Sequence, residues 1–336
     1  MESLTVVFSK KDTVEVERRQ IGEPAEGQVR IQTTKSLIST GTECIMLQTN
    51  YEDDSHWARW CALPICPGYS NIGVIMSVGD GVERLKPGDR VATRSSHWQY
   101  HLIPAYMVTP VPDGVSDEDA AWFALAGITQ IGVRTAEHEL GDVVVIIGAG
   151  PLGQLVVQYV RLTGARAIIV IDLSGPRLEM AKTHGATHTL QMDAADAADA
   201  VRELIGERMA DVVYDITGHA DVFAPATSMV RRFGKLLLLG DTGSPSKQHL
   251  TSDVIVRGVK IIAGHDGHPP KQSSDYAFWT HEEMFQLFFT YLQQARMKVN
   301  DLITHRFSPT EAPEVYTMLI ADRSAAMGVI FDWTGL

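Results

Sequence analysis

Three glycines spaced as G-x-G-x-x-G, Gly148, Gly150 and Gly153, are the residues of this 336-residue chain best suited to chemistry. They follow the continuous apolar run of residues 143–147, which is typical of a buried parallel strand, and they precede a segment with helical apolar spacing. Glycines at these places permit a tight turn and let the backbone approach a pyrophosphate at the helix N-terminus. The pattern therefore predicts a dinucleotide-binding turn, and the alternative is an ordinary strand–helix turn with incidental glycines.

The acidic residue Asp172 supports this interpretation and indicates which dinucleotide binds. It ends the next apolar strand, nineteen residues after Gly153. At this spacing a carboxylate accepts hydrogen bonds from the adenine-ribose hydroxyls and repels a 2′-phosphate. We therefore expect NAD(H) rather than NADP(H).

Two groups of elements have to position these residues. Residues 1 to about 118 carry short apolar runs separated by glycine- and proline-rich turns, which predict a β-rich domain, either a partly open barrel or a sandwich. From residue 143 onward, apolar strands alternate with helical segments, and this alternation predicts a doubly wound parallel sheet in an α/β protein. The predicted strands of this sheet are residues 143–148, 167–172, 212–217, 235–240 and 260–263.

Helices are predicted between these strands and on both sides of them. Acidic residues follow Ser116, so the helix over residues 117–125 is expected to be capped by that serine. We also expect the last strand, residues 328–331, to return to the first domain. The other predicted helices are residues 130–140, 152–163, 175–184, 194–205, 221–230, 280–295 and 311–319.

The composition argues against several classes of function. A net charge of −12 disfavours nucleic acid or an anionic membrane surface as a partner. No apolar stretch approaches the ~20 residues that span a bilayer. The N-terminus lacks the order of a signal peptide, so we expect a cytoplasmic protein. The three cysteines, Cys44, Cys61 and Cys66, are expected to be free thiols.

These motifs together resemble the medium-chain dehydrogenase/reductase superfamily, the relatives of alcohol dehydrogenase. The resemblance extends over nearly the whole chain. It rests on the spaced glycines and the G-D-R-V sequence of residues 68–91, on A-G-I-T at residues 126–129, on the glycine turn, and on L-I-T-H-R-F at residues 302–307.

The resemblance implies a domain organisation and a partner. It implies a GroES-like β-rich catalytic domain over residues 1–122 and 276–336, and a Rossmann NAD-binding domain over residues 123–275. A small alcohol or carbonyl substrate would bind in the cleft between them. Pairing through the edge of the Rossmann domain would give a homodimer or a homotetramer.

This chain departs from the zinc-dependent members of that superfamily at the metal ligands. In those members a Cys, a His and a third ligand hold a catalytic zinc, and the corresponding residues here are Thr40, Tyr69 and Leu125. These side chains cannot replace thiolate and imidazole ligands. Residues 91–106 also lack the cysteines that hold a structural zinc. We therefore expect no zinc, and a metal would need unrelated side chains such as His56, His97 or His101.

Without a metal, hydrogen-bond donors must stabilise the charge that develops on the substrate oxygen. The resemblance places Thr42 against that oxygen and Tyr69 in the cleft, although a turn-capping threonine and a packing aromatic are the alternatives. A phenol with a pKa near 10 would need a cation to lower it. His265 could act as an acid or a base beside the nicotinamide, or it could be structural. Further residues expected in the substrate pocket are Thr40, Glu43, His97, Trp98 and Leu125, of which Glu43 could instead pair with an arginine.

The resemblance also implies the cofactor contacts. The glycines and Leu152 would surround the pyrophosphate, and Asp172 would bind the adenosine ribose. Arg177 would lie beside the same ribose, although alone it would also suit a 2′-phosphate. The full predicted set is Thr129, Gly148, Gly150, Leu152, Gly153, Asp172, Arg177, Thr217, Leu239, Gly240 and His265.

The leading hypothesis is an NAD(H)-dependent, zinc-independent oxidoreductase that transfers a hydride between nicotinamide and an alcohol or carbonyl substrate. Residues 38–43 and 67–69 also resemble the bacteriochlorophyllide dehydrogenase branch, which oxidises a hydroxyethyl group, but Ser70 departs from its pattern. A quinone or enone reductase of this fold also works without zinc, but it usually prefers NADPH, which Asp172 disfavours. A non-catalytic nucleotide-binding protein, like the lens crystallins of this fold, is the third alternative.

Overall fold

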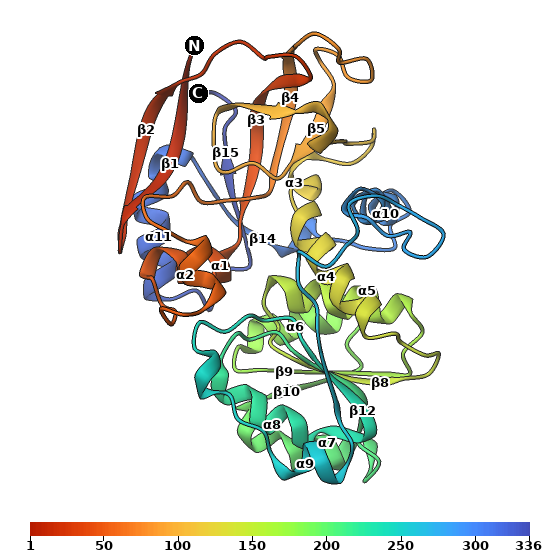
Figure 1. The fold of residues 1–336 in the computed structure, drawn as a ribbon. Coiled ribbons are helices and arrows are strands. Elements are labelled where there is room, and N and C mark those ends of the chain that lie inside the picture. Colours follow the sequence, from red (N-terminus) through yellow and green to blue (C-terminus); the bar gives the residue numbers. More distant parts are fainter. The chain divides into compact units, whose positions relative to one another are not determined.

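The alternating strands and helices of the second half of the chain form a six-stranded parallel sheet (Figure 1). Its order is β10-β9-β8-β11-β12-β13, the doubly wound order with a switch point between β8 and β11. The predicted α/β class and the doubly wound sheet are confirmed. The strands are β8 (Val143–Ile147), β9 (Ala167–Asp172), β10 (His188–Gln191), β11 (Ala210–Asp215), β12 (Val230–Leu238) and β13 (Lys260–Ala263).

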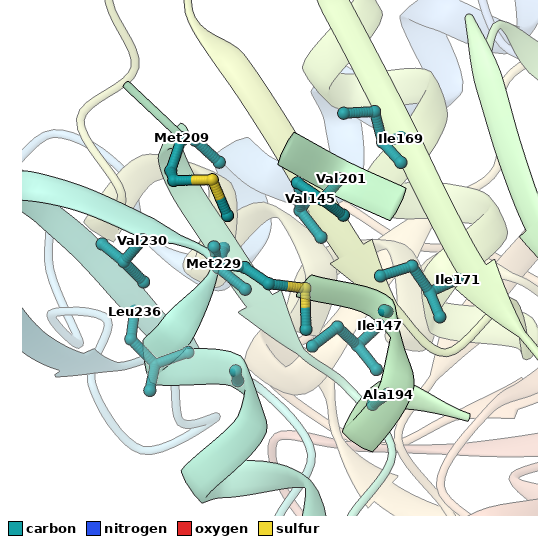
Figure 2. Packing of buried hydrophobic residues seen from close by; sticks show 14 of the residues in the cluster. Val145, Ile147, Ile169, Ile171, Ala194, Val201, Met209, Met229, Val230 and Leu236 are labelled. Atoms are coloured by element: carbon teal, nitrogen blue, oxygen red, sulfur yellow. The ribbon is translucent and has the colours of Figure 1, made fainter. Parts of the chain in front are cut away.

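Two apolar cores cover the two faces of this sheet. The apolar run that leads into the glycine turn is wholly buried, because alternate side chains of a strand point to opposite faces. Val145 and Ile147 pack with Met229 on one face (Figure 2). Val144 packs with Val156 on the other face. The helices of this region are α4 (Phe123–Thr135), α5 (Pro151–Leu162), α6 (Gly175–His184), α7 (Ala197–Ile205), α8 (Phe223–Ser228) and α9 (Ser252–Val256).

The computed structural model describes residues 1–336, which divide into two compact units. The unit with the parallel sheet contains residues 51–55 and 126–280. The other unit contains residues 1–50, 56–125 and 281–336. The C-terminal segment thus belongs to the same unit as the N-terminal strands.

A seven-stranded sheet organises this other unit. Its order is β14-β15-β3-β4-β5-β7, β6 pairs with β3, and β1 and β2 form a separate hairpin. The last strand returns to this sheet by pairing antiparallel with β3, as predicted. The strands are β1 (Glu2–Lys10), β2 (Thr13–Gln20), β3 (Gln28–Ile38), β4 (Asn71–Val78), β5 (Arg90–Thr93), β6 (Tyr100–Pro104), β7 (Val108–Pro110), β14 (Ile303–Phe307) and β15 (Gly328–Asp332). The helices are α1 (Thr40–Gln48), α2 (His56–Trp60), α3 (Asp117–Ala120), α10 (His281–Gln293) and α11 (Ala312–Ala321).

Several elements differ from the sequence prediction for identifiable reasons. No residue of β2 is buried, so this strand lacks the apolar alternation that marks a strand. α1 begins with Thr-Gly-Thr, residues of low helix propensity, and the side chain of Ser39 does not cap it. The helix predicted over residues 117–125 is divided into α3 and α4, although Ser116 caps it as expected, with its Oγ accepting from the Asp119 N–H at 3.0 Å.

Two expectations concern cysteines and membranes. The three cysteines are free thiols, as the sequence predicts. None of the helices combines the length and the apolar content that crossing a bilayer requires.

A buried histidine in β6 makes the stability of the fold depend on pH. His101 lies between two threonines, with Nδ1 3.5 Å from Thr33 Oγ1 and Nε2 3.1 Å from Thr93 Oγ1. Burial lowers the pKa of His101 from 6.5 to about 4. The folded protein therefore binds fewer protons than the unfolded chain between these two values, so this contribution to stability is complete above pH 6.5 and is lost as the pH falls toward 4.

We expect the free energy of unfolding to fall by at most about 3 kcal/mol through this group between pH 7 and pH 4. Urea unfolding at several pH values measures the fall. In His101→Gln, which keeps polar atoms but does not titrate in this range, the slope should become shallower. An unchanged slope in the variant would show that other groups cause the acid sensitivity.

Candidate functional site

The glycine turn lies where β8 ends and α5 begins, and its geometry requires glycine at two positions. Gly148 has φ +104°, in the left-handed region. A Cβ on Gly153 would lie 2.0 Å from the carbonyl oxygen of Gly148, so the helix packs against the turn at a distance that no side chain permits. No side chain caps the N-terminus of α5. The backbone N–H groups of its first turn are thus not used by a capping side chain, which suits an anionic pyrophosphate.

Asp172, the last residue of β9, is held against this turn. Its Oδ2 accepts from the Ala149 N–H at 2.7 Å and its Oδ1 accepts from the Ser174 N–H at 2.8 Å. The guanidinium of Arg177 also lies beside this turn, with Nη1 4.0 Å from where a Cβ on Gly150 would be. A fixed carboxylate here suits ribose hydroxyls and opposes a 2′-phosphate. The residues present therefore fit a bound nicotinamide dinucleotide.

The remaining predicted cofactor residues follow the ends of neighbouring parallel strands. Thr217, after β11, donates from Oγ1 to Asp215 Oδ1 at 2.8 Å. Leu239 is buried after β12, and a Cβ on the next residue, Gly240, would lie 2.5 Å from the backbone of Gly218. Because parallel strands end at one edge of a sheet, these residues share the edge that carries the glycine turn. The remaining members are Leu152 in the first turn of α5 and the fully buried Thr129 in α4.

His265 follows β13 and is exposed. Its Nδ1 accepts from the Gly267 N–H at 3.1 Å, and its ring lies 5.7 Å from that of His268. His265 belongs to the unit with the parallel sheet. The role predicted for it remains a prediction.

In the other unit, Tyr69 and Thr42 are brought together in a cluster of hydroxyl groups. Tyr69 Oη donates to Ser39 Oγ at 2.6 Å, and it also forms a hydrogen bond with Thr42. The guanidinium carbon of Arg94 lies 5.4 Å from the centroid of the Tyr69 ring. Burial raises the pKa of Tyr69, the two hydroxyls and Arg94 oppose this rise, and Glu43 adds to it. The phenol is therefore protonated at neutral pH and can donate a proton.

Glu43 and His97 were expected in the substrate pocket, and the structure corrects this expectation. Both side chains are fully buried, and His97 Nε2 lies 3.1 Å from Glu43 Oε2. Glu43 also accepts from the Ser39 N–H at 2.7 Å and from the hydroxyl of Tyr316. His97 Nδ1 lies 2.8 Å from Ser36 Oγ. These residues form an internal polar network, and Glu43 pairs with a histidine rather than with an arginine.

The other predicted pocket residues are placed separately. Thr40 is buried, and its carbonyl accepts from Arg323 at 3.4 Å. Leu125 is buried in α4. Trp98 is half-buried and lies under the guanidinium of Arg19, 5.6 Å from the ring centroid. The structure thus brings together Thr42 and Tyr69.

The sequence interpretation missed Ser39 and Arg94. Ser39 directly precedes α1, the helix that carries Thr42, but no sequence pattern pairs it with Tyr69, thirty residues away. Arg94 follows β5 and has no motif around it. A requirement for a cation beside the phenol was the signal that could have led to it.

The residues of the predicted ligand positions do not fit a catalytic zinc ion. Thr40, Tyr69 and Leu125 offer no thiolate, imidazole or carboxylate. No group of three or more His, Cys, Asp or Glu side chains lies close enough together to hold a metal ion.

Comparison with protein families gives two matches. The family described as alcohol dehydrogenase GroES-like domain matches residues 26–113. The family described as zinc-binding dehydrogenase matches residues 151–273. The second match contains none of the three predicted ligand positions, so its description does not supply zinc ligands to this chain.

Individual proteins agree with the family matches. The chain is 25% identical over 315 residues to an L-threonine 3-dehydrogenase of Chromobacterium violaceum, covering 83% of this chain and 86% of the relative. It is 28% identical over 295 residues to sorbitol dehydrogenase 1 of Saccharomyces cerevisiae, covering 77% and 79%. A structure from Sinorhizobium meliloti 1021, described as a zinc-binding dehydrogenase bound to NADP, has a TM-score of 0.82 at 19% identity over 99% of both chains. That structure shows a shared fold.

Proposed function

Because the chain belongs to the alcohol dehydrogenase-like medium-chain dehydrogenase/reductase superfamily and is an oxidoreductase of the dehydrogenase type, we propose that it transfers a hydride between NAD(H) and an alcohol or carbonyl substrate without zinc. The observation that carries this proposal is the carboxylate of Asp172, fixed by two backbone N–H groups beside the glycine turn. When bound, NADH supplies the hydride. The glycine turn and Asp172 hold and orient it.

The preference for NAD(H) is tested by the dissociation constants of NADH and NADPH, measured by calorimetry. We expect NADH to bind more tightly, because Asp172 accepts hydrogen bonds from ribose hydroxyls and repels a 2′-phosphate. Asp172→Asn should weaken NADH binding about 10- to 100-fold, since hydrogen bonds to a charged group contribute about 1.5–3 kcal/mol.

A matched control is Asp193→Asn, an aspartate of the same unit that accepts from the Ala195 N–H at 2.9 Å and should leave both constants unchanged. Tighter binding of NADPH than of NADH by the natural protein would contradict the proposed preference, as would equal effects of the two substitutions.

The substrate class is a secondary alcohol, such as a polyol or an amino alcohol, or the corresponding ketone. This proposal is supported by the names of the two relatives, which act on sorbitol and L-threonine. Oxidation of sorbitol and of L-threonine with NAD⁺, followed as NADH absorbance, is the first test. Turnover of an enone with no turnover of either alcohol would favour the reductase alternative instead.

We also propose that two copies of the chain pair along β13. This strand is an edge of the parallel sheet, so its outer N–H and C=O groups have no neighbouring strand. Beside it in the sequence, Leu250, Ile255 and Val256 are 67%, 86% and 75% exposed. An apolar, exposed sheet edge suits association with a second copy.

We expect the natural chain to sediment as a dimer or a tetramer and Ile255→Lys to sediment as a monomer in analytical ultracentrifugation. Leu140→Lys is the matched control, because Leu140 is 90% exposed in the same unit and precedes β8. A monomeric natural chain, or a change caused equally by both substitutions, would contradict pairing along β13.

A further inference from the structure

We propose that Tyr69 is the catalytic proton donor and that Ser39 and Arg94 are the residues that position its hydroxyl and stabilise its phenolate. This inference rests on the proposed hydride transfer and selects one of the three candidate donors that the sequence leaves open. It also gives a function to two residues that no motif identifies.

The hydroxyl groups that bond the phenol can reverse the direction of their hydrogen bonds when Tyr69 loses its proton. Tyr69 Oη donates to Ser39 Oγ at 2.6 Å. A serine hydroxyl is both a donor and an acceptor and can rotate. When a substrate oxygen takes the proton of Tyr69, Ser39 can turn its own hydrogen toward the phenolate. Thr42, the second hydroxyl at this oxygen, can do the same.

Two charged side chains act on the phenol in opposite directions. The charged groups that act on Tyr69 are Glu43 on α1 and Arg94 after β5. Glu43 disfavours the phenolate, but its oxygens are already bonded to the Ser39 N–H, His97 and Tyr316. Arg94 lies 5.4 Å from the ring centroid, within the distance at which a cation interacts with an aromatic ring. Its positive charge favours the negatively charged phenolate.

In the direction of reduction, the substrate gains a hydride at its carbonyl carbon and a proton at its carbonyl oxygen. The hydride adds to the carbonyl carbon, and the two electrons of the C=O π bond move to the oxygen. That oxygen takes the proton of Tyr69 Oη, the O–H bond of the phenol breaks, and its electron pair stays on the phenolate oxygen. A proton from water then restores the phenol. Oxidation of an alcohol runs through the same positions in reverse, with the phenolate as the base.

The other two candidates fit this step less well. Thr42 forms a hydrogen bond with Tyr69, so it belongs to the same cluster, but an aliphatic hydroxyl does not ionise in the range in which a phenol does. His265 Nδ1 accepts the Gly267 N–H, so only Nε2 of this exposed side chain is left to give a proton.

The decisive experiment is a pH titration of the cofactor-free protein, in which the tyrosine ring carbons that bear oxygen are isotope-labelled and followed by NMR. Tyr69→Phe identifies the signal of Tyr69. In Arg94→Met we expect the pKa of Tyr69 to rise by about one unit, because an opposite charge is lost. The matched control is Arg296→Met, which removes an arginine that stacks on Tyr291 at 4.6 Å in the same unit and should leave the Tyr69 signal unchanged.

Turnover adds a second measurement, with sorbitol or L-threonine, whichever the enzyme oxidises. Tyr69→Phe should lower kcat about 10²- to 10⁴-fold, as expected for a lost general acid or base, with an unchanged dissociation constant for NADH. Tyr291→Phe should keep the natural rate. In Arg94→Met and Ser39→Ala, the pH at which oxidation reaches its maximum rate should shift upward.

The outcomes separate this inference from the proposed function. If NADH does not bind, or if neither alcohol is oxidised, the proposed function fails, while the titration still decides whether Arg94 controls Tyr69. If Tyr69→Phe keeps the natural rate, or if Arg94→Met leaves the Tyr69 pKa unchanged, the inference is wrong even though the enzyme is a dehydrogenase.

Discussion

Gly153→Ala is expected to weaken NADH binding about 10- to 100-fold or more and to lower the free energy of unfolding by about 1–3 kcal/mol. The added Cβ would lie 2.0 Å from the Gly148 carbonyl oxygen and 3.0 Å from its carbon. Both are backbone atoms, so no side chain can rotate away. α5 must move off the turn, and the backbone N–H groups that would face the pyrophosphate move with it.

Calorimetry measures the dissociation constant of NADH, and urea unfolding measures the free energy of unfolding. The binding result counts only if the variant is folded. Gly22→Ala is a suitable control, because a Cβ there meets no atom within 4 Å. Retention of natural NADH affinity by Gly153→Ala in a folded protein would show that the dinucleotide does not lie at this turn.

Glu43→Ala is expected to lower the free energy of unfolding by about 3–5 kcal/mol. The carboxylate is fully buried and bonds the Ser39 N–H, His97 and the hydroxyl of Tyr316. Alanine would leave these three groups in the interior without their acceptor, and each buried polar group without a partner is costly. The loss should reach Tyr69 as well, because Ser39 bonds both Glu43 and the phenol.

Urea unfolding at pH 7 measures this loss. Glu43→Gln, which keeps the size and one acceptor oxygen, should lose less. Glu17→Ala removes a carboxylate from a half-buried surface ion pair with Arg19 and should cost no more than about 1 kcal/mol. A loss from Glu43→Ala no larger than that from Glu17→Ala would contradict the importance of the internal network.

The sequence predicts the parallel sheet well because buried strands carry their pattern locally. The strands at residues 167–172 and 260–263 and the helix at residues 175–184 have the predicted bounds. Asp172 and the glycine turn also belong to one continuous unit, β8–α5–β9, so their relation could be predicted from local sequence. Short polar strands such as β10, with no buried residue, carry no such pattern and are missed.

The hydroxyl cluster and the internal network depend on contacts between distant parts of the chain. Ser36 Oγ lies 2.8 Å from His97 Nδ1 and accepts a hydrogen bond from the Trp333 indole N–H at 2.9 Å. These two partners are far apart in the sequence. Because these partners are distant in the sequence, nothing near His97 indicates that its side chain is buried, and the sequence therefore suggested a place in the substrate pocket. Arg94 beside Tyr69 could not be predicted for the same reason.

The most direct test of a zinc-free, nicotinamide-dependent enzyme is the zinc content of the purified protein, measured by elemental analysis after expression in zinc-supplemented medium and in a preparation that binds NADH. We expect zinc far below stoichiometric amounts, because Thr40, Tyr69 and Leu125 offer no ligands. Stoichiometric zinc in that preparation would contradict the assignment of the proton and charge chemistry to Tyr69, Ser39 and Arg94.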